Sequence, residues 1–129
     1  MKPKILLIGF EWDQKILPHV KELQSLAEKF EIISINFLIN ALDEIAKAKL
    51  LETNPIRGFV FQRNILVANP SRCQLIVYFA EKYSEKEIIV INMIHNDQDV
   101  EARNKSVSAD YCKVNDWKRV EALFDKLLT

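Results

Sequence analysis

Hydrophobic residues along the chain follow two alternating patterns. Short runs of consecutive apolar residues recur at intervals, and longer segments with an apolar residue every three or four positions separate them. Consecutive apolar positions predict strands that are covered on both faces, and the wider spacing predicts amphipathic helices. The predicted strands are residues 4–8, 31–36, 58–62, 88–92 and 109–114. Alternation of strands with helices predicts βα units, which build an α/β domain around a parallel sheet.

Five helices are expected between and after these strands. The apolar residues that we expect to face the core are Ile16, Val20, Leu23, Ala27 and Phe30 in the first helix, Leu42, Ile45, Ala46 and Leu50 in the second, Cys73, Ile76, Val77, Ala80 and Tyr83 in the third, and Trp117, Val120, Leu123, Phe124 and Leu127 in the last. The fourth helix is expected within residues 96–108, where Val100, Arg103 or Asn104, and Val107 form a weak stripe. Residues 63–69 are expected to form a loop whose apolar residues, 65–67, pack inward.

Composition narrows the class of protein. A chain of 129 residues without repeats or linker-like segments predicts one domain, residues 1–129. Eighteen basic residues balance eighteen acidic ones, so no overall field would attract nucleic acid or an anionic membrane. The two cysteines fit neither a disulfide framework nor a metal site, which favours a reduced, cytoplasmic setting. Two glycines, Gly9 and Gly58, are too few for a dinucleotide-binding or P-loop phosphate cradle.

The end of the chain carries a resemblance to a known family. Residues 108–121, which run from Ser108-Ala109-Asp110-Tyr111 through Asp116-Trp117, resemble the last strand and helix of response-regulator receiver domains. Residues 4–10, 58–64 and 88–92 then resemble the first, third and fourth strands of that family. The resemblance covers nearly the whole chain. It implies a three-layer, flavodoxin-like (βα)5 fold with a five-stranded parallel sheet in the order 2-1-3-4-5.

The phosphorylation site of the family is missing at the matching positions. Gly9 and Phe10 stand where receivers carry the acidic pair that binds Mg²⁺, and Glu11 alone lies nearby. Gln62 replaces the aspartate nucleophile and Asn92 replaces the hydroxyl residue that binds the phosphoryl group. The family's lysine falls on Val114 by ungapped counting, or on Lys113 after a one-residue gap. The resemblance therefore implies a pseudo-receiver, without enzyme activity, bound metal or cofactor.

Without phosphotransfer, the function expected of such a domain is recognition through its surface. Receivers bind partners through their first helix and through the face formed by the fourth helix, the fifth strand and the fifth helix. Here that second face is mixed in charge with modest apolar content, and it carries Val100, Arg103, Lys105, Val107, Tyr111, Lys113, Lys118 and Glu121. We expect a docking or dimerisation module in signal transduction. Its partner would be another signalling protein, an output domain of a longer chain, or a second copy. Tyr111 occupies the family's switch position, but the favoured interpretation is an amphipathic edge residue with its hydroxyl group in water.

The rival hypothesis is a small ligand-binding domain or enzyme. Its pocket would use Glu11, Gln62, Asn92 and His95, which lie where parallel sheets usually hold their ligands. His95 and Asp97 could act as an acid–base pair, although a histidine in such a loop is usually only solvated. An open polar pocket at the carboxyl end of the sheet would favour this rival, and a pocket plugged by Phe10 and residues 65–67 would favour the docking module.

Overall fold

The structure is a computed structural model that describes residues 2–50, 54–84, 86–108 and 110–129. At its centre is a five-stranded parallel sheet in the order β2-β1-β3-β4-β5. The strands are β1 (Lys4–Ile8), β2 (Glu31–Ile35), β3 (Ile56–Phe61), β4 (Ile89–Ile94) and β5 (Asp110–Lys113). The predicted flavodoxin-like α/β fold and its strand order are thus confirmed.

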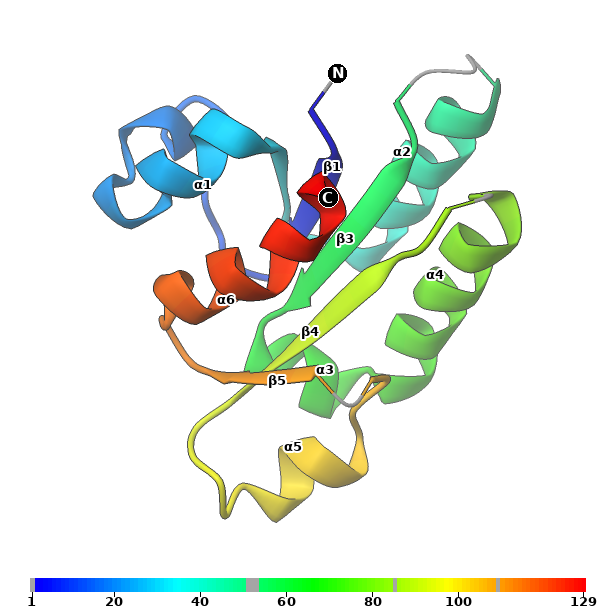
Figure 1. Cartoon of the computed structure of the whole chain (residues 1–129). Helices are drawn as coiled ribbons and strands as arrows, with labels where there is room; N and C mark the ends of the chain where they lie inside the picture. Colours follow the sequence, from blue (N-terminus) through cyan, green and yellow to red (C-terminus); the bar gives the residue numbers. More distant parts are fainter. Residues whose placement is uncertain (1, 51–53, 85, 109) are drawn as a thin grey trace.

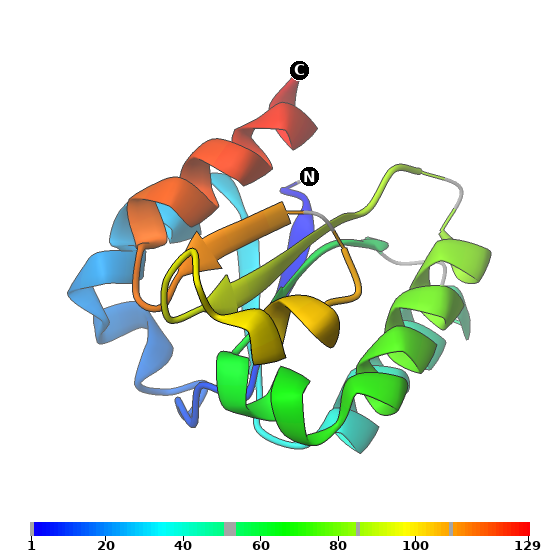
Figure 2. The ribbon, with the colours of Figure 1, turned by 90° about the horizontal axis from the view of Figure 1, so that it is seen from below.

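Helices cover both faces of this sheet. They are α1 (Gln24–Lys29), α2 (Leu38–Leu50), α3 (Arg63–Ala68), α4 (Pro70–Tyr83), α5 (Val100–Asn104) and α6 (Trp117–Phe124), with 3-10 turns η1 (Leu17–His19), η2 (Lys21–Leu23) and η3 (Asp125–Leu128). Figures 1 and 2 show α1 and α6 on one face, and α2 and α4 on the other. The short helices α3 and α5 contact each other and β4 at the end where the strands finish.

The sheet separates two hydrophobic clusters. Alternate residues of β1 point to opposite sides, so that Ile5 and Leu7 join one cluster while Leu6 and Ile8 join the other. All four side chains are fully buried. Burial on both faces is the physical reason why this strand is apolar at every position after Lys4, and the sequence pattern could be interpreted correctly for that reason. No helix among the described ranges is long and apolar enough to cross a membrane.

The predicted apolar stripe of the first helix was wrong in two positions. Ile16 and Ala27 are exposed, whereas Leu17 and Leu26 are buried. Pro18 lies in the first turn of η1, and the segment continues as 3-10 turns, which have three residues per turn. The inward-facing residues therefore recur every three positions rather than every three or four.

Four further predictions about helices need correction. Residues 63–69 are not a loop, because most of them form α3. The second helix buries Ala41, Ile45 and Ala48, and leaves Ala46 and Leu50 exposed. The fourth predicted helix is only the five residues of α5; it buries Ala102, and Val100 is 63% exposed. Tyr83 of α4 is also exposed. The predicted end of the second helix and the start of the fifth strand, residues 51–52 and 109, lie outside the described residues.

Gly58 provides a test of how tightly β3 packs against α6. A Cβ atom built on Gly58 would lie 2.5 Å from Cε1 and 3.0 Å from Cζ of Phe124, whose ring is fully buried. We expect Gly58→Ala to lower the free energy of unfolding by about 1–3 kcal/mol, because the added methyl group overpacks the core. Chemical denaturation measures this change.

The same substitution in a Phe124→Leu background serves as the matched comparison. Leucine is smaller than phenylalanine, so Gly58→Ala should cost less there than in the wild-type chain. Ser25→Ala, on the exposed side of α1, is the control for an ordinary surface change. An equal cost of Gly58→Ala in both backgrounds would show that Phe124 does not limit the space at Gly58.

Candidate functional site

The sequence analysis predicted that the candidate site lies at the carboxyl edge of the sheet. Gly9 follows β1 and Gln62 follows β3; the backbone N–H of Gln62 donates to the Ile8 carbonyl at 3.0 Å, so the two residues lie on neighbouring strands. Asn92 pairs with Phe61 on one side and Tyr111 on the other, and so lies one residue inside the sheet. Gly9 and Gln62 therefore lie close together at the edge, whereas Asn92 lies next to Phe61, one residue further from the edge.

Gln62 is the N-cap of α3. Its side-chain Oε1 accepts hydrogen bonds from the backbone N–H groups of Asn64 at 2.6 Å and Ile65 at 3.3 Å. These groups belong to the first turn of the helix, where no partner exists within the helix itself. The side-chain amide of Gln62 thus has a structural role, because it caps the helix that begins at Arg63.

Ile65 fills the space above Gly9. Gly9 has a φ of +91°, and a Cβ atom built there would lie 2.2 Å from Cγ1 of Ile65. Leu66, the next residue of α3, is fully buried. The inward packing predicted for residues 65–67 is confirmed for these two side chains. A side chain larger than hydrogen at position 9 would require the Ile65 side chain to move.

Phe10 does not contribute to this plug. Its ring stacks on Trp12 at a centroid distance of 5.4 Å and packs against Trp117 at 5.2 Å, beside the hydrophobic cluster beneath α1 and α6. Glu11, between the two aromatic residues, is exposed and has a φ of +59°. Within the described part of the chain, no group of three or more His, Cys, Asp or Glu side chains could hold a metal ion.

Asn92 is buried and its hydrogen-bonding capacity is used. Its Nδ2 donates to the carbonyl oxygens of Ser108 and Asp110, both at 3.2 Å, and its Oδ1 accepts from the backbone N–H of Val107 at 3.3 Å. Its exposed fraction is 0%. The side chain thus fixes the segment that leads into β5, in keeping with the rule that buried polar groups find partners.

Arg63 and Asp99 form an ion pair that the sequence analysis did not identify. The Arg63 Nε donates to Oδ2 of Asp99 at 2.7 Å, and a terminal guanidinium nitrogen donates to Oδ1 at 3.1 Å. The two side chains are 15% and 5% exposed. Asp99 also caps α5 by accepting from the Ala102 N–H, and accepts from the His95 N–H. Arg63 and these N–H groups hold the pKa of the Asp99 carboxyl far below its usual range.

The other chemical candidates do not form a catalytic group. His95 and Asp97 are exposed, and no hydrogen bond joins their side chains in the part of the chain that is described. Cys112 is buried in the cluster beneath α1 and α6, and burial raises the pKa of its thiol to about 12. Burial raises the pKa of the Cys73 thiol to the same value. Neither thiol is ready to act as a nucleophile near neutral pH.

Lys113 and Val114 point in different directions. Lys113 is exposed, whereas Val114 is partly buried against the cluster that contains Trp117. The backbone N–H of Val114 donates to the Ile94 carbonyl, which extends the pairing of β4 with β5. Val114 therefore contributes to packing of the core, and the side chain of Lys113 lies on the surface.

Tyr111 lies half-buried on β5 beneath a cation. The guanidinium carbon of Arg103 lies 5.0 Å from the centroid of the Tyr111 ring, within the range of a cation–π contact. Val100 and Lys118 are exposed on α5 and α6. The α5–β5–α6 face, which we define by Val100, Arg103, Tyr111, Lys113 and Lys118, thus combines one aromatic ring, one aliphatic side chain and three cations.

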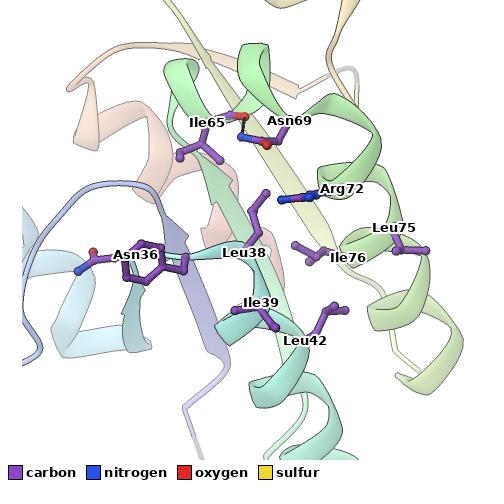
Figure 3. A pocket seen from close by; sticks show the side chains of 10 residues that line it. Asn36, Leu38, Ile39, Leu42, Ile65, Asn69, Arg72, Leu75 and Ile76 are labelled. Carbon is purple, nitrogen blue, oxygen red and sulfur yellow. Dashed lines mark hydrogen bonds between the residues drawn. The ribbon is translucent and has the colours of Figure 1, made fainter.

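A groove between α2 and α4 adjoins this edge, because Ile65 of α3 and Asn36, which directly follows β2, are among its lining residues. It has a volume of about 580 Å³ and is lined by Asn36, Phe37, Leu38, Ile39, Leu42, Ile65, Asn69, Arg72, Leu75 and Ile76 (Figure 3). None of the four residues of the rival pocket, Glu11, Gln62, Asn92 and His95, lines this groove, and the side chains of Gln62 and Asn92 are hydrogen-bonded to the backbone.

Comparisons with protein-family models, with curated proteins and with solved structures found no match for the chain.

The Asp99 carboxylate predicts a specific dependence of stability on pH. Its pKa is lower in the folded chain than the value of about 3.9 expected when unfolded, so its stabilising contribution is complete above about pH 5. The contribution is lost as the pH falls below about 4, through the folded-state pKa. We expect Asp99→Asn, which can still cap α5, to be less stable than the wild type near pH 7, and the gap to narrow in acid. Urea denaturation across this pH range measures it.

Asp97→Asn is the matched control, because it removes the same charge from an exposed residue without an ion pair to the described residues. Its stability should follow the wild type at every pH. A gap between Asp99→Asn and the wild type that stays constant from neutral to acid pH would contradict the assigned role of the charge.

Proposed function

We propose that this chain is a phosphorylation-independent, receiver-like docking module in signal transduction. The observation that supports it best is the state of the carboxyl edge, where the side chains of Gln62 and Asn92 are both engaged with the backbone. Gln62 caps α3, Asn92 holds the segment before β5, and Ile65 occupies the space above Gly9. A fold that retains its sheet while filling its edge with structural contacts is suited to presenting a surface.

The α5–β5–α6 face is the surface that we assign to the partner. Its cations Arg103, Lys113 and Lys118 form no ion pair with other described residues. Glu101 pairs with Arg63, and Glu121 pairs with Lys29, whereas Asp110 of β5 and Asp116, the N-cap of α6, form no ion pair with other described residues. The three unpaired cations outnumber these two unpaired carboxylates, so the face carries a modest excess of positive charge around Tyr111.

This charge favours one kind of partner. Two copies of a cationic face would repel each other, and an acidic protein surface would be attracted. We therefore propose an acidic signalling protein, or an acidic output domain of a longer chain, as the partner. A small, polar contact of this kind suits a transient complex.

Substitution of Gln62 by aspartate tests the loss of phosphotransfer. Aspartate is a good N-cap, so Gln62→Asp should fold with a stability within about 1 kcal/mol of the wild type. It should take up no phosphoryl group from acetyl phosphate with Mg²⁺, because Gly9 and Phe10 provide no acidic pair for the metal. Mass spectrometry of the intact chain measures the uptake.

Gln62→Ala is the companion variant. It removes the cap as well as the amide, and should cost about 1 kcal/mol of unfolding free energy. Phosphorylation of Gln62→Asp, or shifts of amide signals near Gln62 when the wild type is given beryllofluoride and Mg²⁺, would refute the pseudo-receiver assignment.

Charge reversal tests the docking face. The wild-type chain, immobilised and exposed to an extract of its source cells, should retain a partner that is released by high salt, since exposed charges are screened. Lys113→Glu combined with Lys118→Glu should abolish that capture. Quantitative mass spectrometry of the retained proteins provides the measurement.

Lys15→Glu combined with Lys21→Glu is the control, because both residues are exposed cations elsewhere on the surface and the change in net charge is the same. The control pair should capture the partner as the wild type does. Capture that survives reversal on the α5–β5–α6 face, or that both pairs abolish equally, would remove the support for this face.

A further inference from the structure

Exposed apolar side chains gather on one side of the molecule. Among the described residues, nine large hydrophobic side chains are exposed, and six of them lie on α2, on α4 or immediately before α2. We call these six the α2–α4 patch: Phe37, Ile39, Leu50, Leu75, Tyr78 and Tyr83. The other three are scattered over separate elements. Single exposed hydrophobic residues are ordinary, but a concentration of them marks an interaction surface.

The helix α2 is apolar on two faces. Ala41, Ile45 and Ala48 are buried toward the sheet. On the outside, Ile39 and Leu50 are 68% and 82% exposed. A helix that lies on the surface of a monomer normally carries polar residues on its outer face. The outward stripe of α2 therefore indicates a second surface that buries it.

A groove runs between the two helices beneath this patch. Ile39 and Leu42 of α2 lie across from Leu75 and Ile76 of α4, and the side chain of Arg72 reaches from α4 toward α2 (Figure 3). Most of the lining is apolar, and Ile39 at the rim remains largely exposed. Because the groove is open, a small molecule bound in it would remain in contact with water on one side. A protein surface could cover the groove and its rim together.

The charges of this region are self-complementary. Arg72 on α4 and Asp43 on α2 are both exposed, and neither forms an ion pair with another described residue. Asp43 follows Ile39 by four residues, so it lies on the same outward face of α2. A two-fold interface uses the same patch from both subunits, and each Arg72 could then meet the Asp43 of the other copy.

We propose that two copies of this chain associate through their α2–α4 patches, with the groove of each copy covered by the other and with Arg72 paired to Asp43 across the two-fold axis. This interface goes beyond the proposed docking function, does not rest on it, and leaves the α5–β5–α6 face free. Apolar contact supplies the attraction, and the two ion pairs fix the orientation.

Sedimentation equilibrium of the wild-type chain over a range of concentrations tests the proposal first. We expect a reversible monomer–dimer equilibrium. Ile39→Asp combined with Leu75→Asp should raise the dissociation constant at least tenfold, because it places charges in an apolar interface. Both sites are exposed in the single chain, so folding, checked by circular dichroism, should be unchanged.

Ile16→Asp combined with Leu128→Asp is the matched control, since these exposed apolar residues lie outside the patch. This pair should dimerise as the wild type does. The charge swap is the sharper test of the partner: Arg72→Asp and Asp43→Arg should each weaken the dimer, and their combination should restore it. Restoration requires that the two residues act on each other in the dimer.

A wild-type chain that stays monomeric at millimolar concentration would overturn the proposal. So would a dimer that survives Ile39→Asp with Leu75→Asp, or one that Lys113→Glu with Lys118→Glu disrupts instead. A monomeric wild type, or a dimer that survives Ile39→Asp with Leu75→Asp, would not contradict the proposed docking function. Capture of an acidic partner is measured with different variants, on the α5–β5–α6 face.

Discussion

The ion pair between Arg63 and Asp99 joins the segments that cross the carboxyl edge of the sheet. Arg63 is the first residue of α3, and Asp99 is the cap of α5. The same carboxylate accepts the backbone N–H of His95, just after β4. One nearly buried carboxylate thus fixes the start of two helices and the end of a strand. Because a buried charge without its partner is costly, these three elements are held in one arrangement.

The plug over the edge follows from that arrangement. A helix of six residues would not persist by itself, since the first turn is costly to form. In this chain α3 has a cap from Gln62, an ion pair through Arg63 and a fully buried Leu66. Lys105 also donates to the Val67 carbonyl. The edge that often holds ligands in α/β proteins is therefore covered here by a short helix with several anchoring contacts, and the proposal of a surface function builds on this arrangement.

The central strands β1, β3 and β4 could be predicted from the sequence because burial on both faces leaves a nearly continuous apolar run. The final helix could be predicted because Trp117, Val120, Leu123 and Phe124 form one clear stripe. The helix α3 could not, since six residues are too few for a period and glutamine is not among the preferred N-caps. Arg63 and Asp99 lie 36 residues apart in the sequence, and no local sequence pattern predicts that they form an ion pair. On α2 two apolar stripes compete, and only the neighbouring sheet selects the one with the small residues Ala41 and Ala48.

The edges of the sheet limit how this chain can meet another. At β2, the side-chain amide of Gln14 donates to the Ile32 carbonyl at 3.0 Å and accepts from the Ser34 N–H at 3.1 Å, much as an added strand would. At the other edge, β5 has four residues and ends at the exposed Lys113. Short, charged or occupied edges discourage pairing between sheets. Contacts with other chains are thereby directed to side chains on helices, and α2 and α4 present the most apolar of these. A two-fold pairing there would bury the outward stripe of α2 without using a single backbone hydrogen bond of the sheet.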